Sequence, residues 1–527
     1  MKLVTPEQMN CIDAFCAESC GLPTRILMER AAAALREAVC AELAESSGNV
    51  VAFCGGGNNG GDGLAALLQL HGAGIPVSAC LVSETGKMNA SVCHYRGLLE
   101  AQEIPLLVYT AENASESLPL LEKAAAEADV ILDCLFGTGF HGAVSPFISR
   151  VIEIINDSRA YVIAADIPSG VNGTDGNTSE YAVQADKTVT FGHAKPGNVL
   201  YPGREKSGTL KVADIGIPPE AVLRFAPSEG AAEYFAAEET DALLSRCFPK
   251  RKTDSHKGTF GKAGLIAGSF GMCGAAVLAA EACLRMGAGL VTLFLPHDLV
   301  PVCETLFREA VKCPVGEAQE TYFKEEHLYA LLDRVKTTEV LVIGPGLGSR
   351  QETYSFVRSL MEELSGCYAG QVILDADGLN AFAGKAELLR VILNRNGFGE
   401  RVILTPHPAE LSRLLELPVS EICGNRLSCA CKAAQYLHAT LLLKGASTVT
   451  ACSDGSYTVN GTGNSGMATG GSGDVLSGII GGLALRETVY ESGRLGAFYH
   501  GHLGDIAASR MGEAAVLAGD LIEAMKN

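Results

Sequence analysis

Residues 50–70 read VVAFCGGGNNGGDGLAALLQL and carry an apolar strand through a glycine loop into a helix. Glycine lets the backbone turn sharply and approach a ligand, and the start of a helix offers unpaired N–H groups to an anion. Asn58, Asn59 and Asp62 place amide and carboxylate groups in the same loop. We do not assign the loop to the G-x-G-x-x-G class, and since it contains no Gly-Lys-Ser/Thr it is not a Walker A motif either. A structural turn remains the alternative, but the polar side chains favour a ligand-binding loop.

The rest of the first half alternates apolar strands with helical patterns. Two helices open the chain, and the second, about 23–45, has one apolar face. Near-continuous apolar strands are typical of a sheet covered on both faces, and the alternation predicts an α/β fold with a parallel, Rossmann-like, doubly wound sheet. The expected strands are Val50–Cys54, Val77–Val82, Leu106–Tyr109, Val130–Cys134, Tyr161–Ala165 and Lys187–Phe191.

Polar residues follow two further strands of the first half. Asp133 ends the strand in VILDCLFGTGFHGA, and Asp166 and Ser169 follow the strand in VIAADIPSG. Carboxyl ends of parallel strands share one edge of a sheet, so both loops are expected to meet the glycine loop. Oxygen ligands suit a hard cation, and glycine loops suit phosphate groups. Each aspartate alone would equally well cap a turn, but three converging loops favour a site.

The second half also alternates apolar strands with helical patterns, but its loops have different sequences. Its strands end in GPGLG, DADGLN, TPHPAE and KGAST, each a glycine or polar sequence. Helices are expected near 473–485, 493–510 and 514–525. The expected strands are Ala263–Ala267, Leu290–Leu295, Val340–Ile343, Val372–Leu374, Val402–Leu404, Thr440–Leu443 and Val449–Cys452.

Residues 464–482, NSGMATGGSGDVLSGIIGG, place three glycines before Asp474 and an apolar helix after it. Backbone N–H groups at that helix start can form an anion hole for a phosphoryl group. Asp474 is then placed to take a proton from a hydroxyl group. The alternative is a glycine-capped helix in which Asp474 is only the N-cap.

Other strand ends of the second half carry further candidates. Lys444 with Gly445 is a candidate phosphate contact or else a surface turn. His407 lies between two prolines, which stiffen its loop, and is a candidate site residue beside Glu410. A single histidine is more often structural.

Two pairs of residues leave both interpretations open. Asp375 and Asp377 either hold Mg²⁺ or only shape a turn. The run 249–261 is expected to contact phosphate through Lys257 and Gly258, whereas a solvated linker is as good an interpretation of its first half.

A domain boundary is expected in residues 215–240, which contain prolines and acidic residues without a firm period and precede a basic run at 249–252. We predict domains over 1–220 and 236–527. A chain of 527 residues suits two to four domains at roughly 150 residues each.

Composition excludes several classes of protein. Charged residues make up 19% of the chain and hydrophobic residues 47%, which argues against disorder. The net charge of −19 disfavours nucleic acid and anionic membranes as partners. No apolar run has the length of a membrane span, and the first residues lack the apolar core of a signal peptide. The 18 cysteines contain no C-x-x-C pair, so reduced thiols and a cytoplasmic protein are expected.

Residues 1–215 resemble the N-terminal domain of the YjeF family, the NAD(P)H-hydrate epimerases, in the motifs GGGNNGGDG, DCLFGTG, DIPSG and KPG (195–197). The resemblance implies a potassium ion bound by Asn59, Asp133 and Ser169. Asp166 is the expected catalytic acid or base for interconverting the two C6 epimers. The implied contacts to the hydrated dinucleotide are Asn58, Asn59, Gly60, Gly61, Asp62, Gly137, Thr138, Gly139, Phe140, His141, Gly142, Ala143 and Asp166.

Residues 240–527 resemble the ribokinase-like superfamily and, within it, the C-terminal YjeF domain, an ADP/ATP-dependent NAD(P)H-hydrate dehydratase. The motifs are SHKGTFG, AGSFGMCGAA, GPGLG, TPHPAE, KGAST and GGSGD. The resemblance implies ADP as co-substrate with Mg²⁺, although no residue separates ADP from ATP. The implied contacts are Ala275, Gly346, His407 and catalytic Asp474 for the substrate, and Lys444, Gly445, Ala446, Ser447, Thr448 and Gly473 for the nucleotide.

Together the halves predict an enzyme that repairs hydrated NAD(P)H. The first half would interconvert the R and S hydrates, and the second would dehydrate the S form while ADP yields AMP and phosphate. In the second half, Asp474 would deprotonate the C6 hydroxyl, which takes a phosphoryl group and so becomes a better leaving group. The expected partners are NAD(P)H hydrates and ADP. A homo-oligomer is also expected, because apolar helices such as 23–45 could pair.

Two other functions remain possible at this point. One is a small-molecule kinase, such as a vitamin-precursor kinase, fused to a ligand-binding domain, and its product would be a phosphorylated alcohol. The other is a scaffold like the related domains of RNA-decapping assemblies. Those domains lack the polar site residues, whereas Asn59, Asp133 and Asp166 are all present here.

Overall fold

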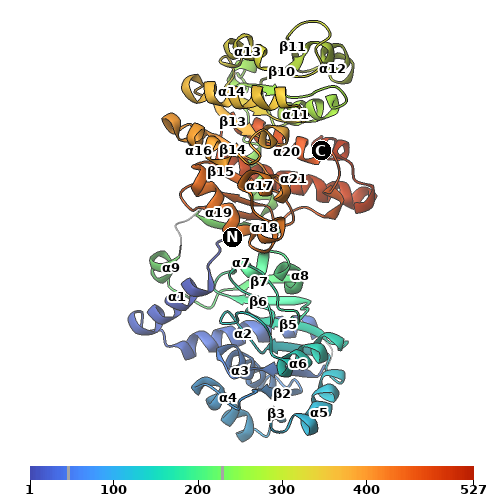
Figure 1. Cartoon of the computed structure of the whole chain (residues 1–527). Helices are drawn as coiled ribbons and strands as arrows, with labels where there is room; N and C mark the ends of the chain where they lie inside the picture. The colour runs from blue at the N-terminus through green and yellow to red at the C-terminus, as the bar shows by residue number, and fades with distance from the viewer. Residues whose placement is uncertain (44–47, 227–230, 527) are drawn as a thin grey trace. The chain divides into compact units, whose positions relative to one another are not determined.

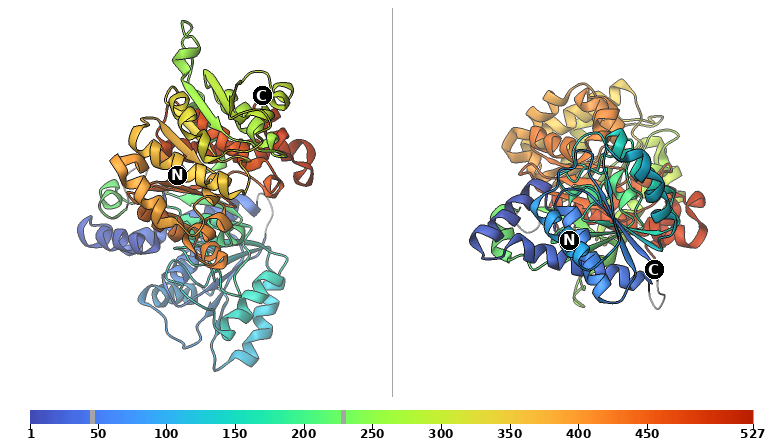
Figure 2. Two further views of the ribbon diagram at one scale, coloured as in Figure 1. Left: turned by 45° about the horizontal axis from the view of Figure 1, so that its top comes forward. Right: turned by 90° about the horizontal axis from the view of Figure 1, so that it is seen from below.

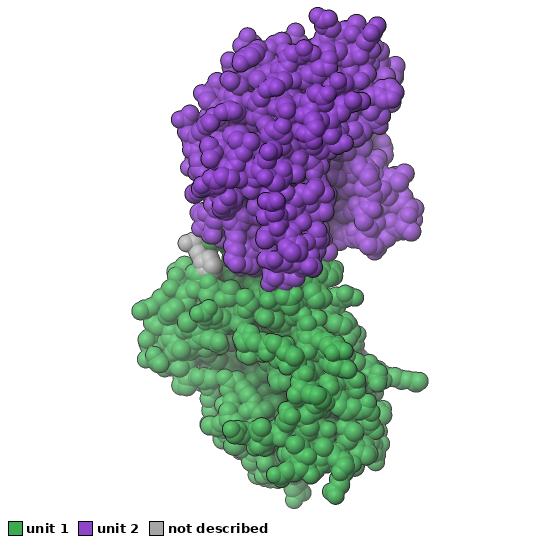
Figure 3. All heavy atoms as spheres, in the orientation of Figure 1, with its two compact units in different colours: residues 1–232 green, residues 233–527 purple. Residues whose placement is uncertain are grey.

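The computed structural model describes residues 1–43, 48–226 and 231–526. The chain divides into two compact units, residues 1–232 and 233–527 (Figure 1; Figure 3). The predicted domain limits, 220 and 236, lie on either side of this division. Residues 227–230 of the predicted linker lie outside the described residues.

Seven parallel strands form the sheet of the first unit, in the order β3-β2-β1-β4-β5-β6-β7. The order reverses direction between β1 and β4, which confirms the predicted doubly wound sheet. The last strand was not predicted, because its sequence TLKVA alternates at a half-exposed edge and lacks an apolar run. The strands are β1 (Val50–Cys54), β2 (Val77–Val82), β3 (Leu106–Tyr109), β4 (Val130–Cys134), β5 (Tyr161–Ala165), β6 (Lys187–Phe191) and β7 (Thr209–Ala213).

Helices cover both faces of this sheet (Figure 2). The helices are α1 (Pro6–Ser19), α2 (Thr24–Leu43), α3 (Asn58–Gly72), α4 (Ala90–Ala101), α5 (Ala114–Ala126), α6 (Pro146–Asp157), α7 (Pro196–Val199), α8 (Gly203–Ser207) and α9 (Pro219–Phe225). Val50 and Ala52 belong to the core beneath α2 and α3, whereas Val51 and Phe53 belong to the core beneath α5 and α6. Successive side chains of a strand point to opposite faces, so a strand covered on both sides has to be apolar throughout.

Helix α2 packs its apolar face inside its own unit. Leu27, Ala31, Leu35 and Ala38 on this face are buried. This burial removes the reason for expecting the helix to pair with a second copy, so the predicted oligomer has no support from α2. The helix was expected over 23–45, and residues 44–45 lie outside the described residues.

The strand register brings the loops of the first unit to one edge. Cys54 at the end of β1 lies opposite Leu81 of β2 and Cys134 of β4. The glycine loop after β1 therefore has the loops after β2 and β4 as its neighbours. The loops after β5 and β6 continue along the same edge, because these strands run parallel to β4.

The second unit contains a ten-stranded sheet in the order β11-β10-β9-β12-β13-β14-β15-β16-β17-β8. Pairing is parallel from β11 to β15 and antiparallel between β15, β16 and β17. The strands are β8 (Ala232–Phe235), β9 (Lys262–Ile266), β10 (Leu290–Pro296), β11 (Val311–Val315), β12 (Val340–Ile343), β13 (Gln371–Leu374), β14 (Val402–Leu404), β15 (Thr440–Leu443), β16 (Val449–Ala451) and β17 (Tyr457–Asn460).

Three strands of this sheet escaped prediction: β8, β11 and β17. Each is short, and β11 is an edge strand that contains a lysine and a proline. Proline is confined to edges and bulges because it cannot donate to the ladder, and such a strand has no clear apolar signal.

Helices α11, α20 and α21 pack together on one face of the second sheet, and α19 packs against β15 and β16. The predicted C-terminal helices match α20, α21 and α22 within a few residues. The helices are α10 (Thr240–Cys247), α11 (Cys273–Arg285), α12 (Val300–Leu306), α13 (Leu328–Val335), α14 (Gln351–Cys367), α15 (Asp377–Asn380), α16 (Ala386–Asn394), α17 (Pro408–Leu415), α18 (Val419–Gly424), α19 (Arg426–Leu437), α20 (Ser472–Leu483), α21 (Val489–Met511) and α22 (Ala518–Ala524). Short 3-10 helices cover Ala237–Glu239, Lys257–Phe260, His297–Leu299, Glu325–His327, Arg395–Arg401, Ser465–Met467 and Glu513–Ala515.

Within residues 1–43, 48–226 and 231–526, no helix combines the length and the apolar character needed to cross a membrane. All 18 cysteines lie in these segments, and each is a free thiol.

Candidate functional sites

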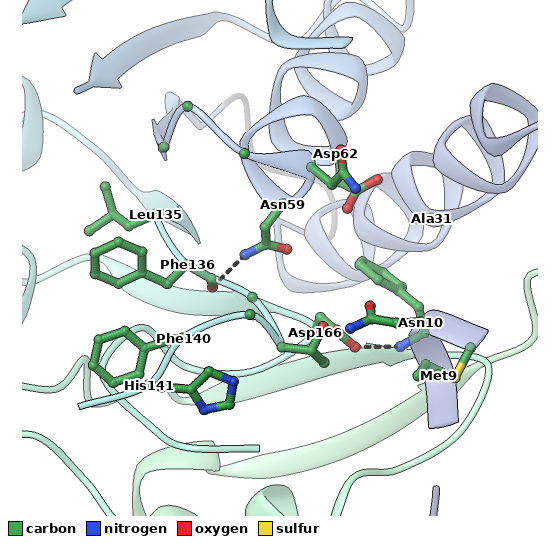
Figure 4. A pocket seen from close by; sticks show the side chains of 18 of the residues that line it. Met9, Asn10, Ala31, Asn59, Asp62, Leu135, Phe136, Phe140, His141 and Asp166 are labelled. Carbon is green, nitrogen blue, oxygen red and sulfur yellow. Dashed lines mark hydrogen bonds between the residues drawn. The ribbon is translucent and has the colours of Figure 1, made fainter. Parts of the chain in front are cut away.

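The first unit has a cavity of about 730 Å³ at the carboxyl edge of its sheet (Figure 4). Its walls are α1, α2, the start of α3 and the loops after β1, β2, β4, β5 and β6. The predicted substrate contacts that line it are Asn58, Asn59, Asp62, Gly137, Thr138, Gly139, Phe140, His141, Ala143 and Asp166. Gly60, Gly61 and Gly142 are not among the lining residues, and Asp133 and Ser169 are buried outside the lining.

The glycine loop has the G-x-G-x-x-G spacing of dinucleotide-binding folds in Gly55, Gly57 and Gly60. The exclusion of this spacing above was therefore wrong. A Cβ atom on Gly60 would lie 1.9 Å from the Gly55 carbonyl oxygen, so this glycine allows α3 to pack against the loop. Gly57 precedes α3, and a Cβ atom there would meet nothing within 4 Å. The loop is therefore open at the position where a phosphate group can approach the start of the helix.

A chain of hydrogen bonds joins the three predicted potassium ligands. The Asn59 amide nitrogen donates to the Phe136 carbonyl oxygen at 2.7 Å, and the Phe136 N–H donates to Ser169 Oγ at 2.9 Å. The Ser169 hydroxyl donates to Asp133 Oδ1 at 2.6 Å, and its N–H donates to Asp133 Oδ2 at 2.7 Å. Burial raises the pKa of Asp133 to about 6, against the effect of the Ser169 hydrogen bonds.

One oxygen of this cluster has no hydrogen-bond partner. Asn59 Oδ1 is buried and no described group donates to it. A buried acceptor without a partner carries a free-energy cost, unless a donor or a cation satisfies it. The candidate ligand atoms here are oxygens of Asn59, Ser169 and Asp133, which fits a hard cation such as potassium.

Asp166 is held in an unusual backbone conformation beside a buried lysine. Its φ is 65°, a left-handed value that non-glycine residues rarely adopt. Lys195 Nζ donates to Asp166 Oδ1, and Thr190 Oγ1 and the Phe191 N–H donate to the same atom at 3.0 and 3.1 Å. The Lys195 side chain is 1% exposed and that of Asp166 13%. The pair is therefore a buried ion pair facing the cavity, and Lys195 was known from the sequence only as part of KPG.

Two further carboxyl groups face the same part of the cavity. Asp62 comes from the first turn of α3 and Asp13 from α1, and Figure 4 shows Asp62 and Asp166 reaching the cavity from different elements. Burial, and then the charges of Asp166 and Asp13, raise the pKa of Asp62 well above its ordinary value. Burial raises the pKa of Asp13 to about 6, with Lys195 opposing. Asp13 was not predicted as a site residue, because the sequence of α1 contains no motif.

Asp375 is the centre of the polar cluster in the second unit. It follows β13, and its side chain is 2% exposed. Lys444 Nζ and Thr405 Oγ1 each donate to Asp375 Oδ1 at 2.7 Å, and Ser477 Oγ donates to Oδ2 at 2.5 Å. Burial acts to raise the pKa of Asp375, but Lys444 and the hydrogen bonds hold it below its ordinary value. The loops after β13, β14 and β15 thus meet the first turns of α20.

Lys444 also faces a second carboxylate, Glu410, at 3.7 Å. Burial acts to lower the pKa of Lys444, but Asp375 and Glu410 raise it overall. His407 caps α17, and its Nδ1 accepts from the N–H groups of Ala409 and Glu410 at 3.1 and 3.3 Å. Burial lowers the pKa of His407. The Lys444 ammonium group is therefore oriented by carboxylates within the predicted nucleotide site.

Asp474 lies in the first turn of α20, near Lys444 and Asp375. Burial raises the pKa of Asp474 to about 7, with Asp375 adding to the rise and Lys444 opposing it. Gly471, with φ 92°, precedes the helix, and a Cβ atom on Gly473 would lie 3.7 Å from Lys444 Nζ. The start of α20, the Lys444 ammonium group and the half-buried Asp474 carboxyl group thus lie close together.

The structure also places the other predicted residues of the second unit. A Cβ atom on Gly346 would lie 3.0 Å from Ala275 Cβ, so these two predicted substrate contacts adjoin. Gly445 to Thr448 (Gly445, Ala446, Ser447, Thr448) form the loop after β15, where the Thr448 hydroxyl donates to the Gly445 carbonyl oxygen at 2.9 Å.

Lys257 and Gly258 lie away from this cluster. A Cβ atom on Gly289, at the amino end of β10, would be 1.8 Å from the Lys257 carbonyl oxygen. The cluster around Asp375 occupies the carboxyl ends of the strands, which is the opposite edge. Lys257 and Gly258 belong to the 3-10 helix Lys257–Phe260, and their position gives no support to a phosphate contact within this cluster.

Asp375 and Asp377, the two aspartates considered for Mg²⁺, already accept hydrogen bonds from other groups of the protein. Asp377 Oδ2 accepts from the Gly348 N–H at 2.8 Å, which ties two loops together. Among the described residues, one group of three acidic or histidine side chains is close enough to share a metal ion: Glu320, Glu326 and His327. Its members already pair with one another or with Lys324, and it includes neither Asp375 nor Asp377.

Comparison with known families matches both units. A family model described as NAD(P)H-hydrate dehydratase matches residues 263–527, and one described as the YjeF-related protein N-terminus matches residues 24–197. The chain is also similar to a solved ADP/ATP-dependent NAD(P)H-hydrate dehydratase from Bacillus subtilis, co-crystallised with ATP and Mg²⁺. The identity is 28% and the TM-score 0.43, over 54% of this chain and 95% of that one.

Curated relatives match over nearly the full length. A bifunctional NAD(P)H-hydrate repair enzyme Nnr from Moorella thermoacetica is 36% identical, covering 99% of this chain and 96% of the relative. Proteins of the same name from Thermofilum pendens and Escherichia coli are 37% and 33% identical, covering 97% of this chain and 93% and 90% of the relatives. These matches favour hydrate repair over the kinase and scaffold alternatives. The chain therefore belongs to the family of bifunctional NAD(P)H-hydrate repair enzymes, with a YjeF-related first unit and an NAD(P)H-hydrate dehydratase second unit.

Proposed function

We propose that the cavity of the first unit epimerises hydrated NAD(P)H and that the cluster around Asp474 dehydrates the S epimer with ADP. The observation that carries this proposal is common to both units. In each, a glycine-lined helix start suited to phosphate lies at the carboxyl edge of a sheet, beside a carboxyl group whose pKa is raised. One part binds the anionic nucleotide and the other transfers a proton.

Epimerisation at C6 needs an acid and a base on different sides of the ring. An acid protonates the C6 hydroxyl, the C6–O bond breaks as the ring nitrogen shares its lone pair, and water leaves. Water then adds to the other face of C6 and gives its proton to a base. We assign the acid to Asp62, which burial keeps protonated, and the base to Asp166, whose charge Lys195 supports.

The sum of these steps moves one proton from Asp62 to Asp166. Starting from the other epimer, the reverse sequence returns that proton. Before the next turnover in the same direction, Asp166 releases its proton to solvent and Asp62 takes one up from solvent, which restores the pair.

The proposed potassium site uses Asn59, Asp133 and Ser169. The support is the buried Asn59 Oδ1 without a donor, beside the Ser169 hydroxyl, the Asp133 carboxylate and the Phe136 carbonyl oxygen. When bound, a cation there would offset phosphate charge near the glycine loop. The residues themselves tie the loop after β4 to α3 through the Asn59–Phe136 hydrogen bond.

For dehydration we assign Asp474 as the base that takes the C6 hydroxyl proton. The hydroxyl oxygen attacks the terminal phosphorus of ADP and AMP leaves. Phosphate then departs from C6, loss of a C5 proton forms the ring double bond, and NAD(P)H results. The nucleotide is expected against residues 444–448 and Gly473, and the substrate against Ala275, Gly346 and His407. Since Asp375 and Asp377 are bonded within the protein, Mg²⁺ is expected to bind to the phosphates of ADP.

The test uses chemically hydrated NADH, which contains both epimers, and follows the return of reduced-nicotinamide absorbance. With the full chain and ADP, we expect both epimers to be converted to NADH, with one AMP and one phosphate formed for each NADH. Without ADP, chromatography should show only interconversion of the epimers. A stable phosphorylated product in place of NADH would instead support a kinase.

A further inference from the structure

The strand order of the first unit determines which groups line each end of its cavity. Strand β2 lies on one side of the central pair β1 and β4, and β5 and β6 lie on the other side. The loops after β5 and β6 supply Asp166 and Lys195, the central loops supply the glycines, and the loop after β2 supplies Glu84. The acid–base groups and Glu84 therefore stand at opposite ends of the site.

This order fixes how a dinucleotide would lie, provided the proposed function holds. The reacting ring has to be at Asp166 and Asp62, and the diphosphate fits the glycine loop, at the point where the strand order reverses. The adenosine ribose is then left for the loop after β2. In doubly wound sheets with the same glycine spacing, an acidic residue accepts a hydrogen bond from the ribose 2′-hydroxyl.

Glu84 is held in place for this contact. Its Oε2 accepts a hydrogen bond from Ser145 Oγ at 2.9 Å, and Ser145 caps the start of α6. Among the described residues, no other group bonds the Glu84 carboxylate. The loop itself is anchored to the glycine loop, because the Asn89 N–H donates to the Gly56 carbonyl oxygen at 2.9 Å. An exposed carboxylate that one hydrogen bond orients, with its other oxygen available, thus lines the cavity.

The charges around this end of the cavity distinguish two substrates. NADPH carries a 2′-phosphate where NADH has a hydroxyl group. Among the described residues that line the cavity, Lys195 is the one lysine and there is no arginine, and Lys195 is paired with Asp166 at the other end. Lys87 of the same loop is not among the lining residues. A 2′-phosphate would meet the Glu84 carboxylate with no lining lysine or arginine to balance it.

We propose that Glu84 makes the epimerase unit selective for hydrated NADH over hydrated NADPH. The 2′-hydroxyl of NADH donates to the carboxylate, whereas the 2′-phosphate of NADPH is repelled by it. This inference rests on the proposed epimerase function and adds a specificity-determining residue to it.

The experiment measures kcat/KM for conversion of the R epimer of each hydrate to the S epimer, by chromatography and without ADP, at a constant potassium concentration. Wild type is compared with Glu84→Gln, which keeps the size of the side chain and removes the charge. The matched control is Glu116→Gln, the same change at an exposed residue of α5 that does not line the cavity.

We expect wild type to favour hydrated NADH by about tenfold or more, and Glu84→Gln to narrow this ratio at least about fivefold, mainly through a gain on hydrated NADPH. The control should keep the wild-type ratio. Equal kcat/KM values in wild type, or an unchanged ratio in Glu84→Gln, would refute the inference and leave the epimerase function standing. Failure to epimerise either hydrate would refute the proposed function and the inference with it.

Discussion

Replacing Lys444 by methionine would leave Asp375 as a buried carboxylate without its counter-ion. Methionine keeps much of the length of the lysine stem, so packing changes little while the charge is lost. Asp375 would keep hydrogen bonds from Thr405 at 2.7 Å and from Ser477 at 2.5 Å. The perturbation therefore isolates the ammonium group and its 2.7 Å contact with Asp375 Oδ1.

The magnitude follows from that distance and from burial. Two unit charges 2.7 Å apart attract by about 6 kcal/mol at an effective dielectric constant of about 20. Desolvation of both groups offsets much of this attraction in the intact pair. Removing only one partner leaves the desolvation of the other uncompensated, and such changes cost about 3–5 kcal/mol. The Asp375 side chain is 2% exposed, so solvent does not screen it.

The loss of stability should depend on pH. In wild type the pKa of Asp375 lies below its ordinary value, so its stabilisation is present above the pKa of the unfolded chain and disappears as pH falls through the folded pKa. Without Lys444, burial would push this pKa above the unfolded value. The variant is then penalised most at neutral pH, and the difference from wild type shrinks as pH approaches about 4.

The assay is urea unfolding of the full chain followed by circular dichroism, with hydrogen exchange to assign the transition to residues 233–527. The control is Lys336→Met, which breaks a 3.5 Å pair with Asp333 in which the two side chains are 44% and 87% exposed. Exposed pairs contribute little, so the control should unfold almost as wild type does. A loss in Lys444→Met no larger than in the control, or one that grows on acidification, would refute the reasoning.

Three further predictions concern catalysis. Asp474→Asn should lower ADP-dependent dehydration by at least about 100-fold and leave epimer interconversion intact. The wild-type dehydration rate should rise with pH through about 7, because the Asp474 base acts only when ionised. A flat pH profile would contradict this role. Lys195→Met should lower epimerisation by about 100-fold or more, because Asp166 loses its buried counter-ion, while purified S hydrate is still dehydrated; loss of both activities would point to misfolding instead. Asn59→Ala should raise the potassium concentration needed for half-maximal epimerisation by about tenfold or more, measured by titration with the cation, and an unchanged requirement would remove Asn59 as a ligand.

Several elements of the fold were predictable because their signals are local. A strand covered on both faces is apolar at every position, as β1 is from Val50 to Cys54. A glycine run before an apolar helix predicts a turn from strand to helix, as between β1 and α3 at residues 55–63. Strands such as β11 escaped prediction, because an edge strand is half exposed and its sequence VKCPV has no period of its own.

The site residues, too, were predictable only where they belong to a local sequence motif. These aspartates lie at the end of a strand, just after one or in the first turns of a helix, close to glycines, so the sequence itself singled them out: Asp62, Asp133, Asp166 and Asp474. Asp13 stands in a helix without a motif and joins the cavity only because α1 packs over the carboxyl edge of the sheet.

The sequence alone predicted an α/β fold for both units and proposed glycine loops as nucleotide sites, because each of these features depends on residues adjacent in the chain. Only the tertiary structure paired Lys195 with Asp166 and Lys444 with Asp375, and only it brought Glu84 into the cavity. These relations join segments far apart in sequence. Charge balance, burial and substrate selection act through space, and the distances that set them exist only once the strands have taken their order.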